Sequence, residues 1–338
     1  MIKERDIGIV LDERFKLHKG PTGHPENPNR LIEVEAGIKK LQGKVTAIEA
    51  RLAQDSEILF VHSPNYLKNL KELPANSIKL DQDTYWCKNS LQVASLAVGS
   101  AIELTQKIAD GDIRSGLAFS RPPGHHAEAE KAMGFCIFNN IAIAAENLHR
   151  SKAAERIVIV DWDVHHGNGT QHHFEGDPNT LYISTHQFPF YPGTGSASEK
   201  GFGKGEGATL NVPMPPNCGE KEYIGVFQHV IEPAIRKFAP DIILASCGFD
   251  SHFSDPLAQM ENTATGFKGM TLIIRALADE LCGGRLAILL EGGYSAKALQ
   301  EGGKAVLEAI LPASVDQLPE TQAVEVNSRL EKILGQIN

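Results

Sequence analysis

Short segments that are apolar almost throughout alternate along the chain with longer segments of helical periodicity, and this alternation limits the possible folds most. Six segments have the length and β-branched content of strands: residues 7–11, 116–120, 156–160, 180–185, 241–246 and 285–290. Most of them lack the polar–apolar alternation of a sheet with one face in water. Strands buried on both faces are typical of parallel sheets, because crossover helices cover both faces. The pattern predicts an α/β fold with a mostly parallel, doubly wound central sheet flanked by helices.

Four segments with helical spacing lie between these strands: residues 90–109, 137–150, 220–238 and 264–281. The last is followed by Gly283-Gly284, which is typical of a helix C-terminus. The chain of 338 residues would allow two domains, at about 150 residues per domain. However, no repeat, low-complexity segment or linker interrupts the pattern, and the glycine-rich residues 193–207 are expected to form a long loop within it. We therefore expect one domain over residues 1–338.

Composition argues against several classes of function. The 33 Lys and Arg against 42 Asp and Glu give a net charge of −9, and without any basic run this argues against nucleic acid as a partner. The longest apolar stretches, residues 242–247 and 286–290, fall far short of the ~18 residues of a membrane span. The N-terminus lacks the pattern of a signal peptide. The five cysteines of the chain include no C-x-x-C spacing, so we expect reduced thiols and a cytoplasmic protein.

Candidate metal ligands follow two of the predicted strands. Asp161, Asp163 and His165 come directly after residues 156–160, and Asp250 follows residues 241–246. Carboxylates and an imidazole suit a borderline divalent ion such as zinc, and Asp163, His165 and Asp250 would leave a fourth position open for catalysis. Each segment also has a plainer interpretation, because aspartates at strand ends often cap the next helix. For the first segment alone, the two interpretations are about equally supported.

Two further strand ends carry groups suited to amide hydrolysis. His125 and His126 lie in a proline- and glycine-rich turn after residues 116–120, and adjacent imidazoles there suggest acid–base catalysis. After residues 285–290, Tyr294 follows two glycines and could donate its hydroxyl to an oxyanion. Taken alone, that last segment is better interpreted as an ordinary turn. Together, the four strand ends predict metal-assisted hydrolysis of an amide.

These segments resemble the ordered motifs of the histone deacetylase family, in its class II-like branch with the arginase–deacetylase fold. The resemblance runs from about His24 to Tyr294, and it rests on residues 121–128, 134–140, 161–170, 248–256 and 291–294. It implies one catalytic zinc ion on Asp163, His165 and Asp250. It also implies that His126 is the general base and acid, and that His125 orients water.

The resemblance extends to the residues around this centre. Asp161 and Asn168 match the partners that hold the two histidines, and Tyr294 matches the residue that polarises the acetyl carbonyl. The family's structural monovalent cation, K+, corresponds to Asp161, Asp163, His165, Ser184 and Thr185. Arg30 matches an arginine that lines an internal channel.

The same comparison implies a tunnel for the acyl-lysine stem, lined by Gly134, Phe135, Tyr191, Leu257 and Gly293. Tyr191 stands where the family usually has Phe, and the preceding loop is shortened, so either Phe190 or Tyr191 could form the wall opposite Phe135. Leu257 occupies the position where polyamine-specific relatives carry glutamate. The expected substrate is therefore an acetylated, or otherwise short-acylated, lysine side chain of a protein or peptide.

Several alternatives remain open at this stage. The substrate could be an acetylpolyamine or another small acyl-amine, and ferrous iron could replace zinc. An arginase-like site with two manganese ions is disfavoured by His252, which stands where a bridging carboxylate would be needed. A catalytically silent acyl-amine-binding module ranks lowest, because every catalytic position is intact. The helix-like residues 330–337 could pack on their own domain or form a homo-oligomer.

Overall fold

The computed structural model describes residues 7–76, 78–311 and 324–337. Its main sheet has eight strands in the order β2-β1-β5-β10-β9-β6-β7-β8, all paired in parallel. The strands are β1 (Ile7–Val10), β2 (Thr46–Ala47), β5 (Ser115–Ala118), β6 (Ile157–Asp161), β7 (Thr180–Gln187), β8 (Thr209–Met214), β9 (Ile242–Cys247) and β10 (Leu286–Leu290). A small antiparallel pair, β3 (Ile78–Lys79) and β4 (Tyr85–Trp86), lies outside this sheet. The predicted α/β fold class is confirmed.

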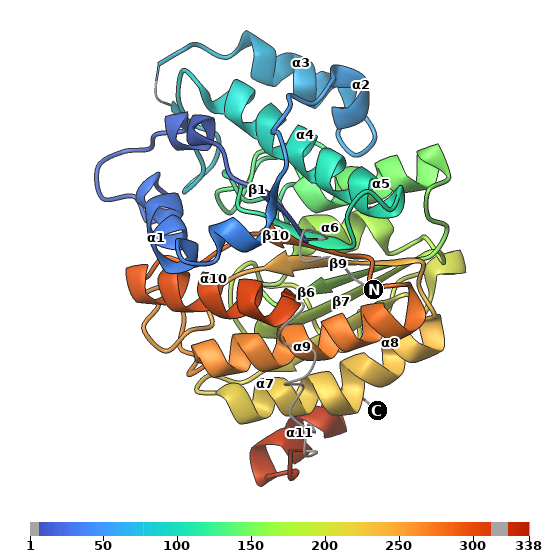
Figure 1. The fold of residues 1–338 in the computed structure, drawn as a ribbon. Coiled ribbons are helices and arrows are strands. Elements are labelled where there is room, and N and C mark those ends of the chain that lie inside the picture. Colours follow the sequence, from blue (N-terminus) through green and yellow to red (C-terminus); the bar gives the residue numbers. More distant parts are fainter. Residues whose placement is uncertain (1–6, 77, 312–323, 338) are drawn as a thin grey trace.

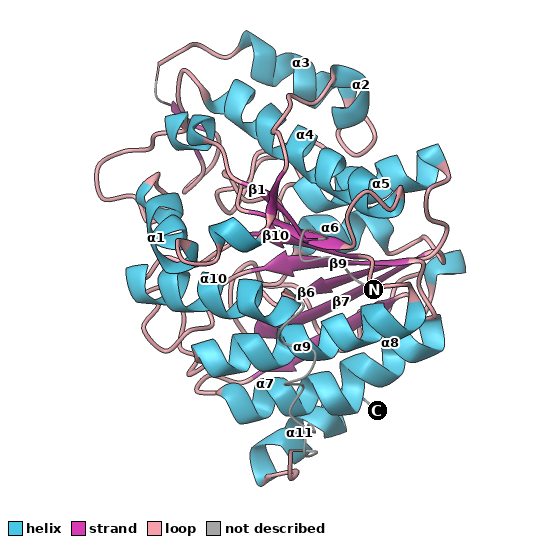
Figure 2. Cartoon of the chain, in the orientation of Figure 1, coloured by secondary structure: helices cyan, strands magenta, loops and turns pink. Residues whose placement is uncertain are grey.

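Helices cover both faces of the sheet (Figure 1, Figure 2). On one face lie α4 (Ser90–Ala109) and α5 (Asn140–Ser151), and on the other lie α7 (Glu220–Val226), α8 (Glu232–Phe238), α9 (Ala264–Leu281) and α10 (Ala296–Ile310). The remaining helices are α1 (Asn29–Ile38), α2 (Asp55–Ile58), α3 (Pro64–Glu72), α6 (Asn168–Phe174) and α11 (Ser328–Ile337). Short 3-10 turns span Glu13–Leu17, Gln42–Lys44 and Gly203–Gly205. Among the described residues, no helix combines the length and apolar character needed to cross a membrane.

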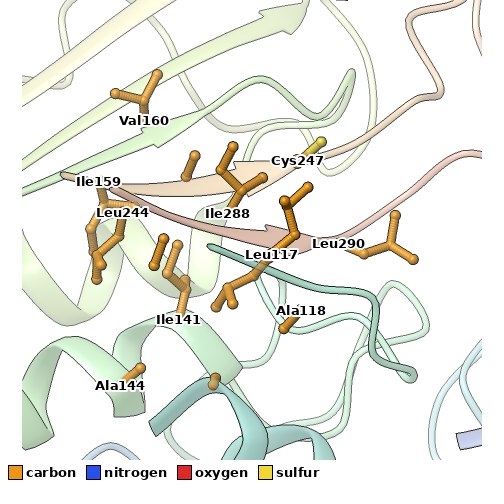
Figure 3. Close-up of a cluster of buried hydrophobic side chains, with 14 of the residues drawn as sticks. Leu117, Ala118, Ile141, Ala144, Ile159, Val160, Leu244, Cys247, Ile288 and Leu290 are labelled. Atoms are coloured by element: carbon orange, nitrogen blue, oxygen red, sulfur yellow. The ribbon is translucent and has the colours of Figure 1, made fainter. Parts of the chain in front are cut away.

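The core explains why the strands are apolar on both faces. Every residue of β1, β5, β6, β7, β9 and β10 is buried. Leu117, Ile159, Leu244 and Ile288, from four neighbouring strands, lie in one buried cluster with Ile141 of α5 (Figure 3). Burying each such side chain contributes ~1.5–3 kcal/mol.

Two strands of the main sheet are absent from the sequence prediction. β2 has only two residues, and β8 contains Pro213. Proline cannot donate a hydrogen bond to the ladder and is confined mainly to edge strands. β8 is an edge strand of the sheet, so it tolerates a proline that would argue against a central strand.

The predicted helices form with small differences. α5 begins at Asn140 because the Asn139 side chain accepts a hydrogen bond from the Ala142 backbone N–H at 3.1 Å. Residues 220–238 form one helical stretch, but Phe227–Ile231 is π-helical just before Pro233, which has no N–H to donate. After α9, Gly284 takes φ +86° and its N–H donates to Ala278 O at 2.8 Å, which confirms the predicted C-terminal signal.

The C-terminal helix packs on its own chain. Leu330 and Ile333 of α11 are fully buried, and a Cβ at Gly225 of α7 would lie 2.4 Å from Leu330 Cδ2. The small residue on α7 therefore makes room for α11. This apolar face is accordingly buried within the chain.

Candidate functional site

Four adjacent strands, β5, β10, β9 and β6, end at one edge of the sheet and supply the candidate site. His125 and His126 follow β5, Tyr294 follows β10, Asp250 follows β9, and Asp163 and His165 follow β6. Ligands of open parallel sheets bind beyond the carboxyl ends of strands, where crossovers change direction. The order of the strands thus brings together residues that lie up to 169 positions apart, from His125 to Tyr294.

Asp163, His165 and Asp250 form a compact group of potential metal ligands. His165 Nδ1 lies 3.1 Å from Asp163 Oδ1 and 3.2 Å from Asp250 Oδ2, and the donor atoms of all three lie within 4.8 Å of one another. A tetrahedral zinc site with ligands at ~2.0 Å has edges of about 3.3 Å. Asp250 Oδ2 is buried and accepts no hydrogen bond. The donor set and its spacing therefore fit a divalent cation.

Backbone amides hold the two carboxylates in place. Asp163 accepts hydrogen bonds from His165 N at 2.9 Å and from Gly292 N at 2.7 Å, and Asp250 Oδ1 accepts one from Val164 N at 2.9 Å. A Cβ at Gly248 would lie 2.2 Å from Asp163 Oδ2, so this position has no room for a side chain. Loops from three strands thus orient the group.

The electrostatics of this group also fit a cation. Burial and the charge of Asp163 raise the pKa of Asp250 to about 7. Burial lowers the pKa of His165, but the adjacent carboxylates of Asp163 and Asp250 outweigh it and raise this pKa to about 10. Two carboxylates packed side by side therefore favour a positive charge between them.

Behind this group, the two histidines have different partners. His125 Nδ1 lies 3.0 Å from Asp161 Oδ2, which also accepts a hydrogen bond from the Tyr182 hydroxyl at 3.1 Å. His126 Nδ1 lies 2.8 Å from Asn168 Oδ1. One imidazole thus has a carboxylate partner and the other a neutral amide.

These partners separate the proton affinities of the two rings. Burial lowers the pKa of His125, but the charges of Asp161 and Asp163 outweigh it and raise this pKa to about 10. Burial and the charges of His125 and His165 lower the pKa of His126 well below its usual value. The arrangement therefore offers a neutral imidazole beside a cationic one, which is suited to acid–base chemistry.

The turn that carries Tyr294 is bonded from several directions. The Tyr294 N–H donates to Asp255 Oδ2 at 2.6 Å. The Arg30 Nε donates to Gly293 O at 2.7 Å, its guanidinium also donates to Glu291 O, and its Cζ lies 4.9 Å from the Tyr294 ring centroid. Arg30 is therefore a buried residue that contacts the tyrosine and its backbone.

Aromatic rings surround the approach to the group. Phe135 makes an edge contact with Tyr294, with ring centroids 5.6 Å apart. Tyr191 makes edge contacts with His126 at 5.2 Å and His165 at 6.0 Å, and it is 37% exposed. Phe190 instead stacks on His165 at 5.5 Å. The two candidates for the tunnel wall thus occupy different places: Tyr191 contacts both His126 and His165, whereas Phe190 stacks on His165.

Two other predicted tunnel residues, Gly134 and Leu257, contact residues of the candidate site or of the loop that supports it. A Cβ at Gly134 would lie 2.3 Å from His126 Cδ2, and the residue has φ +56°, so a side chain is disfavoured there on both counts. Leu257 is half-buried, and its N–H donates to Asp255 Oδ1 at 3.0 Å. Asp255 therefore bonds to both the Leu257 loop and the Tyr294 turn.

The residues expected to hold a monovalent cation lie on two paired strands. Asp161 of β6 is in register with Ser184 of β7. Ser184 Oγ lies 2.9 Å from His186 Nδ1, whereas Thr185 Oγ1 is buried and lacks a hydrogen-bond partner. A buried hydroxyl oxygen without a donor is compatible with a cation nearby.

Several supporting residues have no role in the sequence prediction. Glu291 Oε2 accepts hydrogen bonds from Gly124 N at 2.6 Å and His125 N at 3.2 Å, so it holds the histidine turn. Its position directly after β10 is a signal that strand-end reasoning could have used. Glu26 is fully buried against Arg121, 95 positions away, and no local pattern points to that pair.

Comparisons with known proteins agree with this geometry. The family model described as the histone deacetylase domain matches residues 24–310. A probable deacetylase of Archaeoglobus fulgidus is 40% identical over 293 residues, which cover 85% of this chain and 81% of that protein. Histone deacetylase 15 of Arabidopsis thaliana is 38% identical over 90% of this chain but only 56% of its own length.

A solved structure, the crystal structure of the HDA15 HD domain, superposes with a TM-score of 0.86 at 36% identity, covering 98% of this chain and 95% of that one. The histone deacetylase clr3 of Schizosaccharomyces pombe is 37% identical over 97% of this chain and 52% of its own length. The chain therefore spans about half the length of these eukaryotic relatives and most of the archaeal one.

Proposed function

Because the chain belongs to the histone deacetylase family, whose members are deacetylases, we propose that it uses zinc to remove acetyl or another short acyl group from lysine side chains of proteins or peptides. The observation that carries this proposal is the convergence of Asp163, His165 and Asp250 beside the histidine pair. A hydrolytic metal, a base and an oxyanion donor are the groups that amide hydrolysis requires.

Asp163, His165 and Asp250 would hold the metal. A bound divalent ion supplies Lewis-acid polarisation of a carbonyl and of water. The same donor set also suits ferrous iron, so the metal content of the purified protein is part of the test. Glu291, which belongs to a second buried group with His125 and Cys136, already accepts hydrogen bonds at both carboxylate oxygens. Because both oxygens of Glu291 are engaged in hydrogen bonds, this second group is poorly suited to hold a metal ion, which favours one catalytic metal over an arginase-like pair.

His126 acts as the general base in this proposal. Its pKa is lowered and its Nδ1 faces Asn168, so Nε2 can accept a proton from the attacking water and later return it to the leaving amine. His125, paired with Asp161, stays cationic and orients the water. The Tyr294 hydroxyl donates a hydrogen bond to the developing oxyanion.

The residues around the centre complete the proposal. The lysine stem lies between Phe135 and Tyr191, where burial of its methylenes favours binding. A structural K+ would be held by Asp161, Asp163, His165, Ser184 and Thr185, and the buried, unpaired hydroxyl of Thr185 supports this assignment.

An acylated lysine peptide is the preferred substrate because Leu257 is apolar. An acetylpolyamine or another small acyl-amine is the second candidate, since the chain carries a net charge of −9 and attracts cationic substrates generally. A single catalytic domain over residues 1–338, a cytoplasmic location and a possible homo-oligomer remain predictions, as does the absence of nucleic-acid and membrane partners.

The test is hydrolysis of an acetyl-lysine fluorogenic peptide by the purified protein, with metal content measured on the same sample. His126→Ala and Tyr294→Phe are expected to lower kcat at least 100-fold while one metal ion per chain remains bound. Full activity of either variant would overturn its assigned role. Two manganese ions per chain would overturn the choice of a single zinc.

A further inference from the structure

A chain of hydrogen bonds runs from the buried His126 to the protein surface. Behind the ring, Asn168 presents Oδ1 to His126 Nδ1 at 2.8 Å, and its Nδ2 donates to Glu128 Oε1. The same carboxylate oxygen lies 2.8 Å from His172 Nδ1. Exposure rises along the chain, because Glu128 is 24% exposed and His172 is 43% exposed in their side chains. The function proposed above gives no role to Glu128.

The chemistry of the central amide makes Glu128 important. A carboxamide can face a neighbour with either its oxygen or its NH2, and the two orientations differ by a simple flip. An ionised carboxylate only accepts hydrogen bonds, so beside Glu128 the amide must present Nδ2. Oδ1 of Asn168 is then the atom that faces His126. A ring nitrogen opposite an oxygen acceptor must carry the proton, so Nδ1 of His126 is protonated and its Nε2 keeps a free lone pair.

We propose that Glu128 is a positioning residue that sets the tautomer of His126 through the orientation of the Asn168 amide. This inference rests on the proposed function, in which Nε2 of His126 accepts the proton of the attacking water. With the amide flipped, Nδ2 would face the ring, Nδ1 would have to accept, and Nε2 would carry the proton. A ring in that state cannot act as the base.

The other contacts of the Asn168 amide are weaker. Its Nδ2 also lies 3.4 Å from His126 O, near the long limit for an N–H···O hydrogen bond, and 3.4 Å from Met133 Sδ, a thioether and therefore a weak acceptor. The bond to Glu128 involves an ionised acceptor, and such bonds are about twice as strong as neutral ones. Burial raises the pKa of Glu128, but the hydrogen bonds from His172 and Asn168 outweigh it and lower this pKa, so the group remains an acceptor at neutral pH.

The chain provides a matched control pair. Glu146 of α5 lies 3.0 Å from His173 Nε2, one residue after His172 on α6, and it is 20% exposed. Glu146 also accepts a hydrogen bond from Arg150 Nε at 3.0 Å, and neither of these two bonds involves His125 or His126. It has the same chemistry as Glu128 and a similar side-chain exposure, 20% against 24%, but its bonds to His173 and Arg150 do not lead to His126.

The experiment replaces Glu128 with an acceptor, an apolar group and a donor: Glu128→Gln, Glu128→Met and Glu128→Lys. With the acetyl-lysine peptide, kcat is expected to fall less than threefold, about tenfold and about 100-fold, in that order, while KM stays within twofold. The same three substitutions at Glu146 should leave kcat within twofold. Thermal unfolding of every variant, with metal content, identifies any that fail to fold.

A spectroscopic measurement tests the tautomer without relying on turnover. In 15N-histidine-labelled holoenzyme, ring cross-peaks that vanish in His126→Gln identify His126. We expect a protonated Nδ1 and a bare Nε2 in the wild type and in Glu128→Gln, and a protonated Nε2 in Glu128→Lys. An unchanged tautomer in Glu128→Lys would overturn the inference whatever the activity.

The failure of this inference can be distinguished from the failure of the proposed function. A wild-type protein that hydrolyses no acyl-amine would refute the function, whereas the ring spectra would still report on Glu128. An active wild type whose kcat is matched by all three Glu128 variants would refute the inference alone.

A double-mutant experiment gives a further test. In an Asn168→Asp background both side-chain oxygens accept hydrogen bonds, so Glu128→Met should then lower kcat less than twofold. A tenfold loss persisting in that background would also refute it.

Discussion

The backbone N–H of Gly292 donates a hydrogen bond of 2.7 Å to Asp163 Oδ2. The turn after β10, which carries Tyr294, is therefore bonded directly to a carboxylate of the metal-ligand group after β6. The bond needs a close approach, because a Cβ at Gly292 would lie 2.1 Å from Asp250 Oδ2 and 2.5 Å from Asp163 Oδ2. A backbone hydrogen bond thus links the turn of the proposed oxyanion donor directly to a metal ligand.

Gly292→Ala should weaken metal binding by about 10- to 100-fold, the range found when groups that support metal ligands are lost. The added methyl is too close to both carboxylates, so it must displace Asp163 and Asp250 or shift the turn itself. The measurement is competition for zinc against a chelator of known affinity, followed by kcat at saturating zinc. Gly303→Ala in α10 is the control, because a Cβ there meets only ordinary contacts, the nearest being Val34 Cγ1 at 3.5 Å. Equal zinc affinity in the two variants would contradict the prediction.

Glu26→Gln should cost about 3–5 kcal/mol of unfolding free energy at pH 7, because it leaves buried cations without their anion. Glu26 contacts Arg121 through both carboxylate oxygens, and its Oε1 lies 3.2 Å from Arg30 Nη1; all three side chains are almost fully buried. Denaturant unfolding measures the loss. Glu232→Gln, which breaks an exposed pair with Arg236, should cost at most ~1 kcal/mol. A loss at Glu26 as small as the ~1 kcal/mol expected at Glu232 would contradict the prediction.

The sequence predicts those parts of the structure that are marked by a pattern within a few consecutive residues. Six of the eight strands of the main sheet were predictable because a strand buried on both faces is uniformly apolar. The metal-ligand group was predictable because Asp163, His165 and Asp250 directly follow such strands, and parallel strands end at one edge. β8 was missed because Pro213 is tolerated only at the edge of the sheet.

The supporting network was beyond local reasoning for a physical reason. Glu26, Arg121 and Arg30 are charged residues whose burial depends on one another, and two of them lie 95 positions apart. A charged side chain in a loop normally indicates exposure. Glu128 is similar, since its bond to Asn168 requires α6 to pack beside the histidine turn. Glu26, Arg121 and Glu128 become recognisable as supporting residues only once the strand order is known, whereas the family resemblance already points to Arg30.

His62 should make the protein less stable as the pH falls from 6.5 to 4. Its Nε2 accepts a hydrogen bond from Asn139 N at 2.9 Å, and its Nδ1 lies 3.0 Å from Glu128 O, so protonation would break the first bond. Burial lowers its pKa to about 4. Between this value and the unfolded pKa of ~6.5, the unfolded state binds more protons, so stability is lost on acidification, by roughly 3 kcal/mol in total.

The check is urea unfolding of the wild type and His62→Gln at pH 7 and pH 4. The variant lacks this titration, so the stability advantage of the wild type at pH 7 should shrink by roughly 3 kcal/mol at pH 4. The contributions of the other buried histidines are common to both proteins and cancel in the difference. A difference that stays constant between the two pH values would rule out the proposed role of His62.

Leu257→Glu should shift the substrate preference toward acetylputrescine. Leu257 is half-buried in the loop that Asp255 bonds to the Tyr294 turn, and the resemblance to polyamine-specific relatives puts a glutamate at this position. A carboxylate there would pair with the distal ammonium of the polyamine, and one charge-assisted hydrogen bond is worth ~1.5–3 kcal/mol. The ratio of kcat/KM for acetylputrescine over acetyl-lysine peptide should therefore rise at least tenfold. Leu257→Gln, similar in size but neutral, should change this ratio less than threefold, and an equal rise in both variants would attribute the shift to shape rather than charge.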